Sequence, residues 1–207
     1  MPKAAHRVPP APPEDTKGRL LATAIDLFSE KGYNGVSVRD IAAAVGLSAP
    51  ALYNHFPNKK ALYQAAVAAA FEGPAQRLLA DLQADTPAPE RLRRFLHTAA
   101  REIRQIPAFC RLMDRELLDG DDERLGFLGE AVFSPIQQPF MALLDELRPG
   151  CDAFLLSEMI FGMLKQHDDM LALCGHLAGA GDTDRSPEQI AELAFTLVQG
   201  YLQGGAA

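Results

Sequence analysis

Residues 37–60 read SVRDIAAAVGLSAPALYNHFPNKK, and this stretch predicts two short helices joined by a tight turn. Ser37 followed by Asp40 three residues later forms a capping box that starts the first helix. Gly46 can adopt the left-handed conformation that ends this helix and turns the chain sharply. Ser48 then caps the second helix. The stretch therefore predicts a helix-turn-helix unit, and the rest of the sequence can be interpreted around it.

In a helix-turn-helix unit the second helix lies in the major groove of DNA, so its exposed side chains are candidate base contacts. Few of these side chains are charged here, which favours apolar contacts with thymine methyl groups and hydrogen bonds from Tyr53, Asn54 and His55. Flanking basic side chains, and the N–H groups of the helix that Asn58 caps, are expected to meet the phosphates. The predicted DNA contacts are Arg39, Ser48, Ala49, Pro50, Ala51, Tyr53, Asn54, His55 and Lys59.

The run from Gly18 to Leu62 resembles the TetR family of transcriptional regulators. It contains FSEKGYNGVSV at residues 28–38 and IAAAVGLSAPALYNHFPNKKAL at residues 41–62. The glycine turn, the L-Y-x-H-F pattern and the following helix start are together far more specific than a bare helix-turn-helix pattern. Relatives often carry base-reading polar or small residues at positions 49 and 51, and both are alanine here. By position, the resemblance implies DNA contacts from Arg39, Ala49, Pro50, Ala51, Tyr53, His55 and Lys59.

The chain has 207 residues and a net charge of −7, but this charge is unevenly distributed. Residues 1–60 hold eight Lys or Arg and five Asp or Glu, a net +3, whereas residues 61–207 hold twelve and twenty-two, a net −10. A basic head attracts DNA and an acidic body is repelled by it, which orients the molecule. The predicted domains are a disordered basic arm (1–13), a helix-turn-helix DNA-binding domain (14–60) and a ligand-binding and dimerisation domain (61–207).

Five prolines lie among the first thirteen residues together with Lys3, His6 and Arg7. This composition predicts a basic arm rather than a signal peptide, because the segment has no apolar core. No apolar run is long enough to cross a membrane. The three cysteines are widely spaced and odd in number, which favours free thiols in a reducing cytoplasm. A cytoplasmic protein is expected.

Apolar residues recur at three- and four-residue steps along most of the chain, with no alternating strand pattern from Pro87 onward and no Asn-Gly hairpin turn after residue 35. The sequence therefore predicts an all-α fold of about nine helices, in which a three-helix DNA-binding domain precedes a helical ligand-binding and dimerisation domain. Gly73 and Pro74 predict a kink or break in the helix that starts after Asn58. Ser134-Pro135 and Pro139 are expected to bend or break the helical stretch 124–147.

Helices that are distorted by proline and packed beside bulky aromatic residues leave irregular space, which a ligand cavity requires. We therefore expect a small apolar ligand to bind in the second domain. Plain core packing is the alternative interpretation for each Phe and Met concerned. The predicted pocket residues are Phe71, Phe95, Phe109, Met113, Phe133, Phe140, Met159 and Met163.

The last two helices, near residues 152–177 and 187–203, carry apolar residues on more than one face. A helix that is apolar on two sides needs two partners, so one side can fill the core and the other can meet a second copy. The resemblance implies the same, because in TetR-family relatives the last two helices of each subunit form a four-helix dimer interface. The predicted interface residues are Phe154, Gly162, His167, Leu193, Leu197 and Gly200.

Two further patterns allow alternative interpretations. The first is a row of five arginines, which suggests a second nucleic-acid surface or, as the pattern favours, a solvated face balanced by acidic stretches such as residues 119–123. These arginines are Arg91, Arg93, Arg94, Arg101 and Arg104. The second is the pair His167 and Cys174, seven residues apart on one helical face. It suggests a metal site or, as the pattern favours, an interface histidine and a buried free cysteine.

These observations predict a homodimeric transcriptional repressor that a small apolar ligand releases from its operator. Double-stranded operator DNA, a second copy of the chain and a small-molecule effector are the expected partners, and no cofactor, metal or membrane is expected. One alternative is a DNA-binding regulator without an effector, or with an effector that increases binding. Another is a helical metal-sensing or enzyme-like module. An enzyme is not expected, because no nucleophile elbow, phosphate-binding glycine loop or paired acid and base is present.

Overall fold

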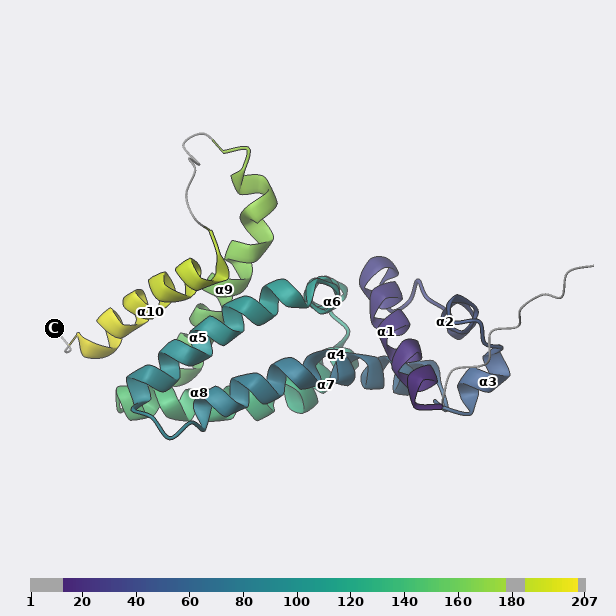
Figure 1. The fold of residues 1–207 in the computed structure, drawn as a ribbon, viewed down its shortest axis with the longest axis horizontal. Coiled ribbons are helices and arrows are strands. Elements are labelled where there is room, and N and C mark those ends of the chain that lie inside the picture. The colour runs from purple at the N-terminus through teal and green to yellow at the C-terminus, as the bar shows by residue number, and fades with distance from the viewer. Residues whose placement is uncertain (1–12, 178–184, 205–207) are drawn as a thin grey trace, which may run out of the picture. The chain divides into compact units, whose positions relative to one another are not determined.

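A computed structural model describes residues 13–177 and 185–204 (Figure 1). Over these residues the chain is helical and has no strand, which confirms the all-α prediction. A membrane-spanning helix is not found among them. The predicted basic arm lies outside the described residues, apart from Pro13, which begins the first helix. The elements are α1 (Pro13–Lys31), α2 (Val38–Ala44), α3 (Ala49–Tyr53), α4 (Lys59–Leu82), α5 (Ala88–Gln105), α6 (Pro107–Asp119), α7 (Asp122–Phe127), the π-helix η1 (Leu128–Phe133), α8 (Ser134–Leu147), α9 (Ala153–Cys174) and α10 (Pro187–Gln203).

The chain forms two compact units, which divide between Ala70 and Phe71. The division falls inside α4, so one helix leads the chain from the first unit into the second. The sequence placed the domain boundary at residue 60, where α4 has only begun. Each unit has buried apolar residues of its own, and each is described separately below.

The first unit is organised around α1 and the start of α4. Leu20, Ala24 and Phe28 lie on one buried face of α1, as their helical spacing predicts. Phe28 meets Tyr63 of α4 edge-on, with 5.4 Å between the ring centroids, and stacks with Tyr33 at 5.8 Å. These ring contacts join α1 to the first part of α4.

Of the kink or break predicted at Gly73-Pro74, the break is wrong, because α4 runs through both residues. Proline removes a single N–H, the one that would donate to the carbonyl of Ala70. Pro74 is buried, and Leu78 and Leu82 further along the helix belong to the core of the second unit. Packing of this face holds the helix together on the far side of the proline.

The core of the second unit forms where α5 packs against α8, α9 and α10 (Figure 1). Phe95 of α5 stacks on Phe140 of α8 with 4.2 Å between the ring centroids. Phe161 of α9 meets both rings edge-on, at 6.0 and 5.7 Å. Aromatic pairs in these geometries add to the burial of apolar surface. The predicted apolar face of α5 is therefore its core-facing side.

Between α7 and α8 the chain stays helical but is irregular. Residues Leu128–Phe133 form a π-helix, which ends where the hydroxyl of Ser134 donates to the Gly129 carbonyl at 2.7 Å. Pro135 follows directly and has no N–H to contribute to a regular helix. The expected distortion at Ser134-Pro135 is thus confirmed, whereas α8 continues through Pro139 without a break.

Candidate nucleic-acid interface

Hydrogen bonds at both helix starts fix the helix-turn-helix unit. Ser37 Oγ accepts from the Asp40 N–H at 3.2 Å, and Asp40 Oδ2 accepts from the Ser37 N–H at 2.8 Å, which completes the predicted capping box. The Ser37 hydroxyl also donates to Asp40 Oδ2 at 2.7 Å, and this bond, followed by the one from the Ser37 N–H, lowers the pKa of the Asp40 carboxyl and keeps it charged at the positive end of α2. Gly46 has a φ of 75°, and Ser48 Oγ accepts from the Ala51 N–H at 3.3 Å to cap α3.

Buried side chains hold α3 so that its other face points outward. Leu52 and Phe56 are buried, as are Ile41 and Ala42 of α2, the helix against which α3 packs. Tyr53 keeps 50% of its surface exposed. Of the predicted groove-facing residues, Ser48, Pro50, Tyr53, Asn54 and His55 are exposed, and Ala49 and Ala51 are half-buried. The exposed set offers hydroxyl, amide and imidazole groups to a base edge.

Basic groups lie on the elements that flank α3. Arg39 is exposed on α2. Asn58 Oδ1 accepts from the Ala61 N–H at 2.8 Å and caps α4, as the sequence predicts. Lys59, the first residue of α4, has its Nζ 4.3 Å from the centre of the Tyr33 ring. The sequence suggested a phosphate contact for Lys59, but it gave no sign of this aromatic partner.

Arg19 of α1 is a further basic residue of the unit that sequence reasoning missed. Its Nη2 donates to the carbonyl of Val45 at 3.3 Å, directly before the glycine turn between α2 and α3. The two residues are 26 positions apart in the sequence, so neither helical periodicity nor motif spacing carries a signal for the bond. The bond ties α1 to the turn that orients α3.

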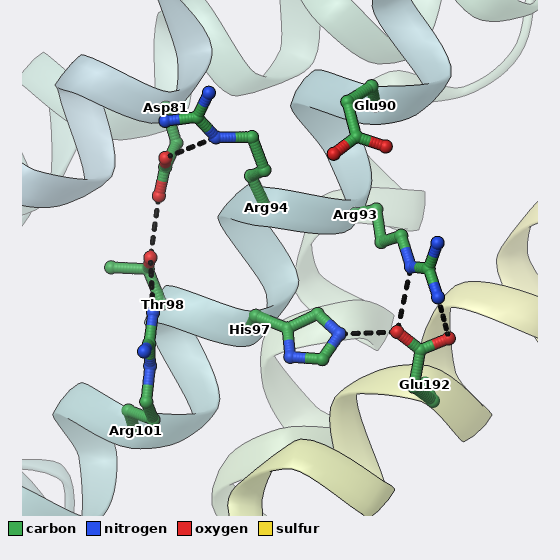
Figure 2. A pocket seen from close by; sticks show the side chains of 8 residues that line it. All are labelled: Asp81, Glu90, Arg93, Arg94, His97, Thr98, Arg101 and Glu192. Atoms are coloured by element: carbon green, nitrogen blue, oxygen red, sulfur yellow. Dashed lines mark hydrogen bonds and ion pairs between the residues drawn. The ribbon is translucent and has the colours of Figure 1, made fainter.

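A second candidate site is a polar pocket of about 450 Å³ formed by α4, α5 and α10 (Figure 2). The buried carboxylate of Asp81 accepts from Thr98 Oγ1 at 2.6 Å and from Arg94 Nε at 3.1 Å. Much of the charge in the pocket is thus paired within it, and its polar surface does not suit the apolar ligand that the sequence predicts. The lining residues are Asp81, Glu90, Arg93, Arg94, His97, Thr98, Arg101 and Glu192.

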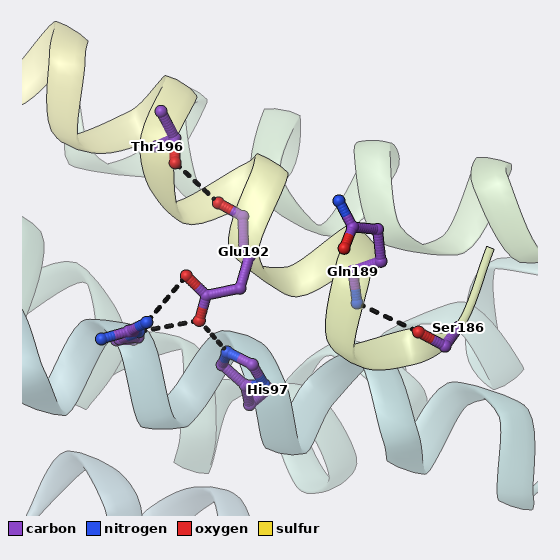
Figure 3. A network of polar contacts seen from close by, with 6 residues as sticks. His97, Ser186, Gln189, Glu192 and Thr196 are labelled. Carbon is purple, nitrogen blue, oxygen red and sulfur yellow. Dashed lines mark hydrogen bonds and ion pairs between the residues drawn. The ribbon is translucent and has the colours of Figure 1, made fainter. Parts of the chain in front are cut away.

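Glu192 connects α10 to α5 at one side of this pocket (Figure 3). Its carboxylate accepts from Arg93 Nε at 2.7 Å and from Arg93 Nη2 at 2.9 Å, and it lies 2.5 Å from His97 Nε2. The hydrogen bonds from Arg93, and then from His97, lower the pKa of Glu192. The pairing joins the helix that carries the arginine row to the last helix of the chain.

The arginines of α5 have other partners than the acidic stretch 119–123 that the sequence offered. Because α5 packs among several helices, its arginines meet the carboxylates of those neighbours. The pairs are Arg91–Glu146, Arg93–Glu192, Arg94–Asp81 and Arg104–Asp168, while Arg101 donates to Thr98 Oγ1 at 3.4 Å. The acidic stretch instead binds Arg124, through Asp119 and Asp121.

The eight predicted ligand-pocket residues lie in different environments. Phe71, Phe109 and Phe133 form an aromatic cluster, in which Phe71 stacks on Phe109 at 4.9 Å and Phe133 meets the two rings at 5.6 and 6.2 Å. None of the eight residues lines the polar pocket. The other five are Phe95 and Phe140, buried in the core, Met113, half-buried on α6, and Met159 and Met163, exposed on α9.

The predicted interface residues lie on α9 and α10. Exposed among them are Phe154, Gly162, Leu193, Leu197 and Gly200. His167 is half-buried, and its pKa is lowered by burial and then by the nearby charge of Arg104. The exposed members form apolar surface on the two helices that the sequence assigned to a partner.

Over the described residues, no three His, Cys, Asp or Glu side chains converge in a way that could hold a metal ion. His167 and Cys174 are both half-buried on α9. Burial raises the pKa of the Cys110 thiol to about 11, so this sulfur is protonated at neutral pH and is a poor metal ligand.

Similarity to known proteins is strongest over the helix-turn-helix unit. The family model described as "Bacterial regulatory proteins, tetR family" matches residues 20–66. The biofilm operon icaADBC HTH-type negative transcriptional regulator IcaR of Staphylococcus aureus (strain Newman) is 43% identical over 56 residues, which cover 27% of this chain and 30% of IcaR. The chain therefore matches less than a third of the length of these curated relatives.

Solved structures resemble the chain over most of its length. The TetR family transcriptional regulator PfmR from Thermus thermophilus has a TM-score of 0.63 and 27% identity, and the match covers 91% of this chain and 100% of PfmR. The transcriptional regulator FadR from Bacillus subtilis, in complex with stearoyl-CoA, has a TM-score of 0.70 and 16% identity, with 87% and 96% covered. Residues 20–66 thus match the N-terminal helix-turn-helix domain of the TetR family of transcriptional regulators, in a chain that shares its fold with PfmR.

Proposed function

We propose that the chain is a homodimeric DNA-binding repressor that a small apolar ligand releases from its operator. The observation that carries this proposal is the construction of α3. The helix is capped by Ser48 and anchored through buried Leu52 and Phe56, while its other face is exposed. A short helix held in this way is pre-organised to enter a major groove as a rigid element.

The exposed face of α3 supports a particular mode of reading DNA. Tyr53, Asn54 and His55 supply hydrogen-bonding groups for base edges, and the small apolar side chains beside them suit thymine methyl groups. Arg39 and Lys59, together with Ser48 and the capped N-terminus of α4, suit the phosphates on either side. This division of roles separates sequence reading from orientation on the duplex.

The exposed apolar surface of α9 and α10 supports a two-fold dimer. Large apolar side chains that remain exposed on these two helices are Phe154, Leu155, Met159, Met163, Leu173, Leu193, Leu197 and Tyr201. Apolar surface of this extent on adjoining helices is typical of an interface. A two-fold dimer presents two copies of α3, which can read two half-sites about one helical turn apart, ~34–36 Å.

The aromatic cluster of Phe71, Phe109 and Phe133 is the part of the predicted ligand site that we retain. Phe133 is 36% exposed and lies on the π-helix, a type of element that often occurs at functional sites. Phe71 belongs to α4, the helix that begins at the DNA-binding unit. The FadR structure holds stearoyl-CoA, so a relative in fold accommodates a long acyl chain. A ligand that separates these rings would displace the second half of α4.

Repression, rather than activation, is proposed because the relative IcaR is a negative regulator. Two alternatives predict different behaviour. A regulator without an effector would bind DNA equally well with and without ligand, and an effector that increases binding would raise the affinity. The metal-sensing or enzyme-like alternative predicts tightly bound metal in the purified protein, which elemental analysis detects.

The experiment begins with in vitro selection of duplexes from a random DNA library by the purified protein. We expect enrichment of an inverted repeat, which a two-fold dimer requires. Stearoyl-CoA and stearate are then titrated against the complex with the selected duplex. A coupling of about 1–3 kcal/mol would lower the DNA affinity by roughly 5- to 150-fold. Failure to enrich any duplex at low salt would contradict the function as a DNA-binding regulator.

A further inference from the structure

Lys59 and Tyr33 form a cation–π contact in the first unit. The ammonium of Lys59 lies over the face of the Tyr33 ring, 4.3 Å from its centre. Both residues are half-buried, in contrast to the exposed Lys60 that follows. An ammonium within about 6 Å of a ring centre is attracted by the negative face of the aromatic ring. The lysine is thus held by a specific partner.

The Tyr33 ring is itself fixed by two buried aromatic residues. Phe28 stacks with it at 5.8 Å and an angle of 21° between the ring planes, and Tyr63 meets it edge-on at 5.1 Å and 85°. Phe28 is 0% exposed and Tyr63 is 1% exposed. A ring packed in this way cannot follow a moving lysine, so the lysine adopts the position that the ring sets.

Lys59 lies in the first turn of α4, where the helix dipole does not stabilise a cation. Helix N-termini favour negative charge, yet the first turn of α4 contains Lys59 and Lys60 and no acidic residue. Asn58 caps the same turn. Two cations and the backbone N–H groups of one helix start together attract an anion such as a phosphate.

We propose that Tyr33 is a positioning residue for DNA binding, which holds the ammonium of Lys59 in place for one phosphate of the operator backbone. The proposal rests on the proposed DNA-binding function and adds a residue that does not itself touch DNA. A flexible lysine loses side-chain entropy when it binds a phosphate. A lysine that the ring has already oriented loses less, so the ring increases affinity without contributing to sequence preference.

The first test measures the affinity for the selected duplex at several salt concentrations, because each neutralised phosphate contributes about 0.9 to the slope of log K against log salt. Lys59→Met is expected to lower this slope by about 0.9. Tyr33→Leu is expected to weaken binding by about 2- to 5-fold. In the background of Lys59→Met, the same Tyr33 change should have little further effect. Lys31→Met, at an exposed position on α1, is the control for loss of one lysine charge.

The second test keeps the shape of the ring, because Tyr33→Leu can also disturb the packing of Phe28 and Tyr63. Tyr33→Phe, and then phenylalanines with increasing ring fluorination at this position, progressively weaken the negative face of the ring. We expect DNA affinity to fall along this series when Lys59 is present and to stay constant with Lys59→Met. Circular dichroism checks that each variant is folded.

Two results would overturn the proposal. One is an affinity that does not change along the fluorinated series in the presence of Lys59. The other is an equal loss along the series with and without Lys59, which would assign Tyr33 a role in folding alone. Either result can be obtained only if the unmodified protein binds the selected duplex. Absence of any binding by that protein would instead contradict the proposed function.

Discussion

Tyr53 is a large aromatic residue whose exposure on α3 has no role in the buried core of its unit. It leaves half of its surface in solvent on a helix of five residues, while the neighbouring Leu52 is fully buried. We expect Tyr53→Ala to leave the fold intact and to weaken binding to the selected duplex by about 1–3 kcal/mol, roughly 5- to 150-fold. Fluorescence anisotropy measures this loss. The control is Leu118→Ala on α6, where 87% of the side chain is exposed. Equal affinities for wild type and Tyr53→Ala would remove Tyr53 from the interface.

Arg124 is the residue on which the buried carboxylate of Glu116 depends. Glu116 is 0% exposed, and Arg124 Nε donates to its Oε2 at 2.5 Å. Removal of one partner leaves a buried charge without compensation, so Arg124→Met should lower the free energy of unfolding by about 3–5 kcal/mol. Urea unfolding followed by circular dichroism measures this change.

Two further variants separate charge from packing at this site. Arg124→Met combined with Glu116→Leu removes both charges and should be less damaging than Arg124→Met alone. Arg111→Met, at an exposed position on α6, should change the free energy of unfolding by less than about 0.5 kcal/mol. A single Arg124 variant as stable as the Arg111 variant would show that the ion pair contributes nothing to stability.

At the scale of the helix, starts were predictable, whereas interruptions were predictable only in part. A cap is a local device, so Ser37, Asp40 and Ser48 could be recognised from their spacing, and the structure confirms their bonds. Proline is also recognised locally, but its effect depends on what the surrounding face packs against. Pro74 lies in an unbroken α4, whereas the helix before Pro135 widens into a π-helix. Packing across the unit decides between these results, and periodicity does not report it.

Replacement of Pro74 tests how much stability a proline costs inside an unbroken helix. Proline inside a helix is less favourable than alanine by about 3 kcal/mol, because an N–H is lost and the ring crowds the preceding turn. Loss of the buried ring offsets part of this, so Pro74→Ala should raise the free energy of unfolding by about 1–2 kcal/mol. Pro107→Ala, at the exposed start of α6, should be nearly neutral. Urea titrations compare the two, and a less stable Pro74 variant would mean that ring packing dominates.

The contacts that Glu192 of α10 makes with Arg93 and His97 of α5 predict how stability depends on pH. The pKa of Glu192 is lowered by its bonds to Arg93 and His97, so its contribution to stability is present above the ordinary glutamate pKa of about 4.3 and is lost as the pH falls through the lower folded value. Glu192→Gln should therefore unfold at a lower temperature than wild type at pH 7, and the difference should shrink below about pH 4. Glu188→Gln, one turn earlier and exposed, is the control. A difference that is constant with pH would contradict the assignment to this carboxylate.

At the scale of the whole chain, the predictable parts are those that a local pattern encodes. The exposed face of α3 could be predicted because the helix and its caps are continuous in the sequence. The ion pairs of α5 could not, because Arg91 pairs with Glu146 across 55 positions and Arg93 pairs with Glu192 across 99. For the same reason, the sequence could not show which residues of the predicted ligand pocket lie together. Bulky apolar residues indicate that a core exists, but tertiary packing alone decides which of them meet, as Phe71, Phe109 and Phe133 do.

The exposed apolar face of α9 and α10 leads to the prediction that tests the assembly. Leu197 on α10 is 56% exposed, so Leu197→Glu should cost a single chain little, whereas in a two-fold dimer it places a charge at an apolar contact on both sides. We expect the variant to be monomeric in analytical ultracentrifugation, with unchanged helical content. Because a monomer presents one copy of α3, its affinity for the selected inverted repeat should fall by at least about tenfold. Leu117→Glu, at a 72% exposed position on α6, should leave both the dimer and the DNA affinity unchanged. A dimeric Leu197→Glu protein would place the interface elsewhere, and a monomeric one with full affinity would mean that a single DNA-binding unit is sufficient.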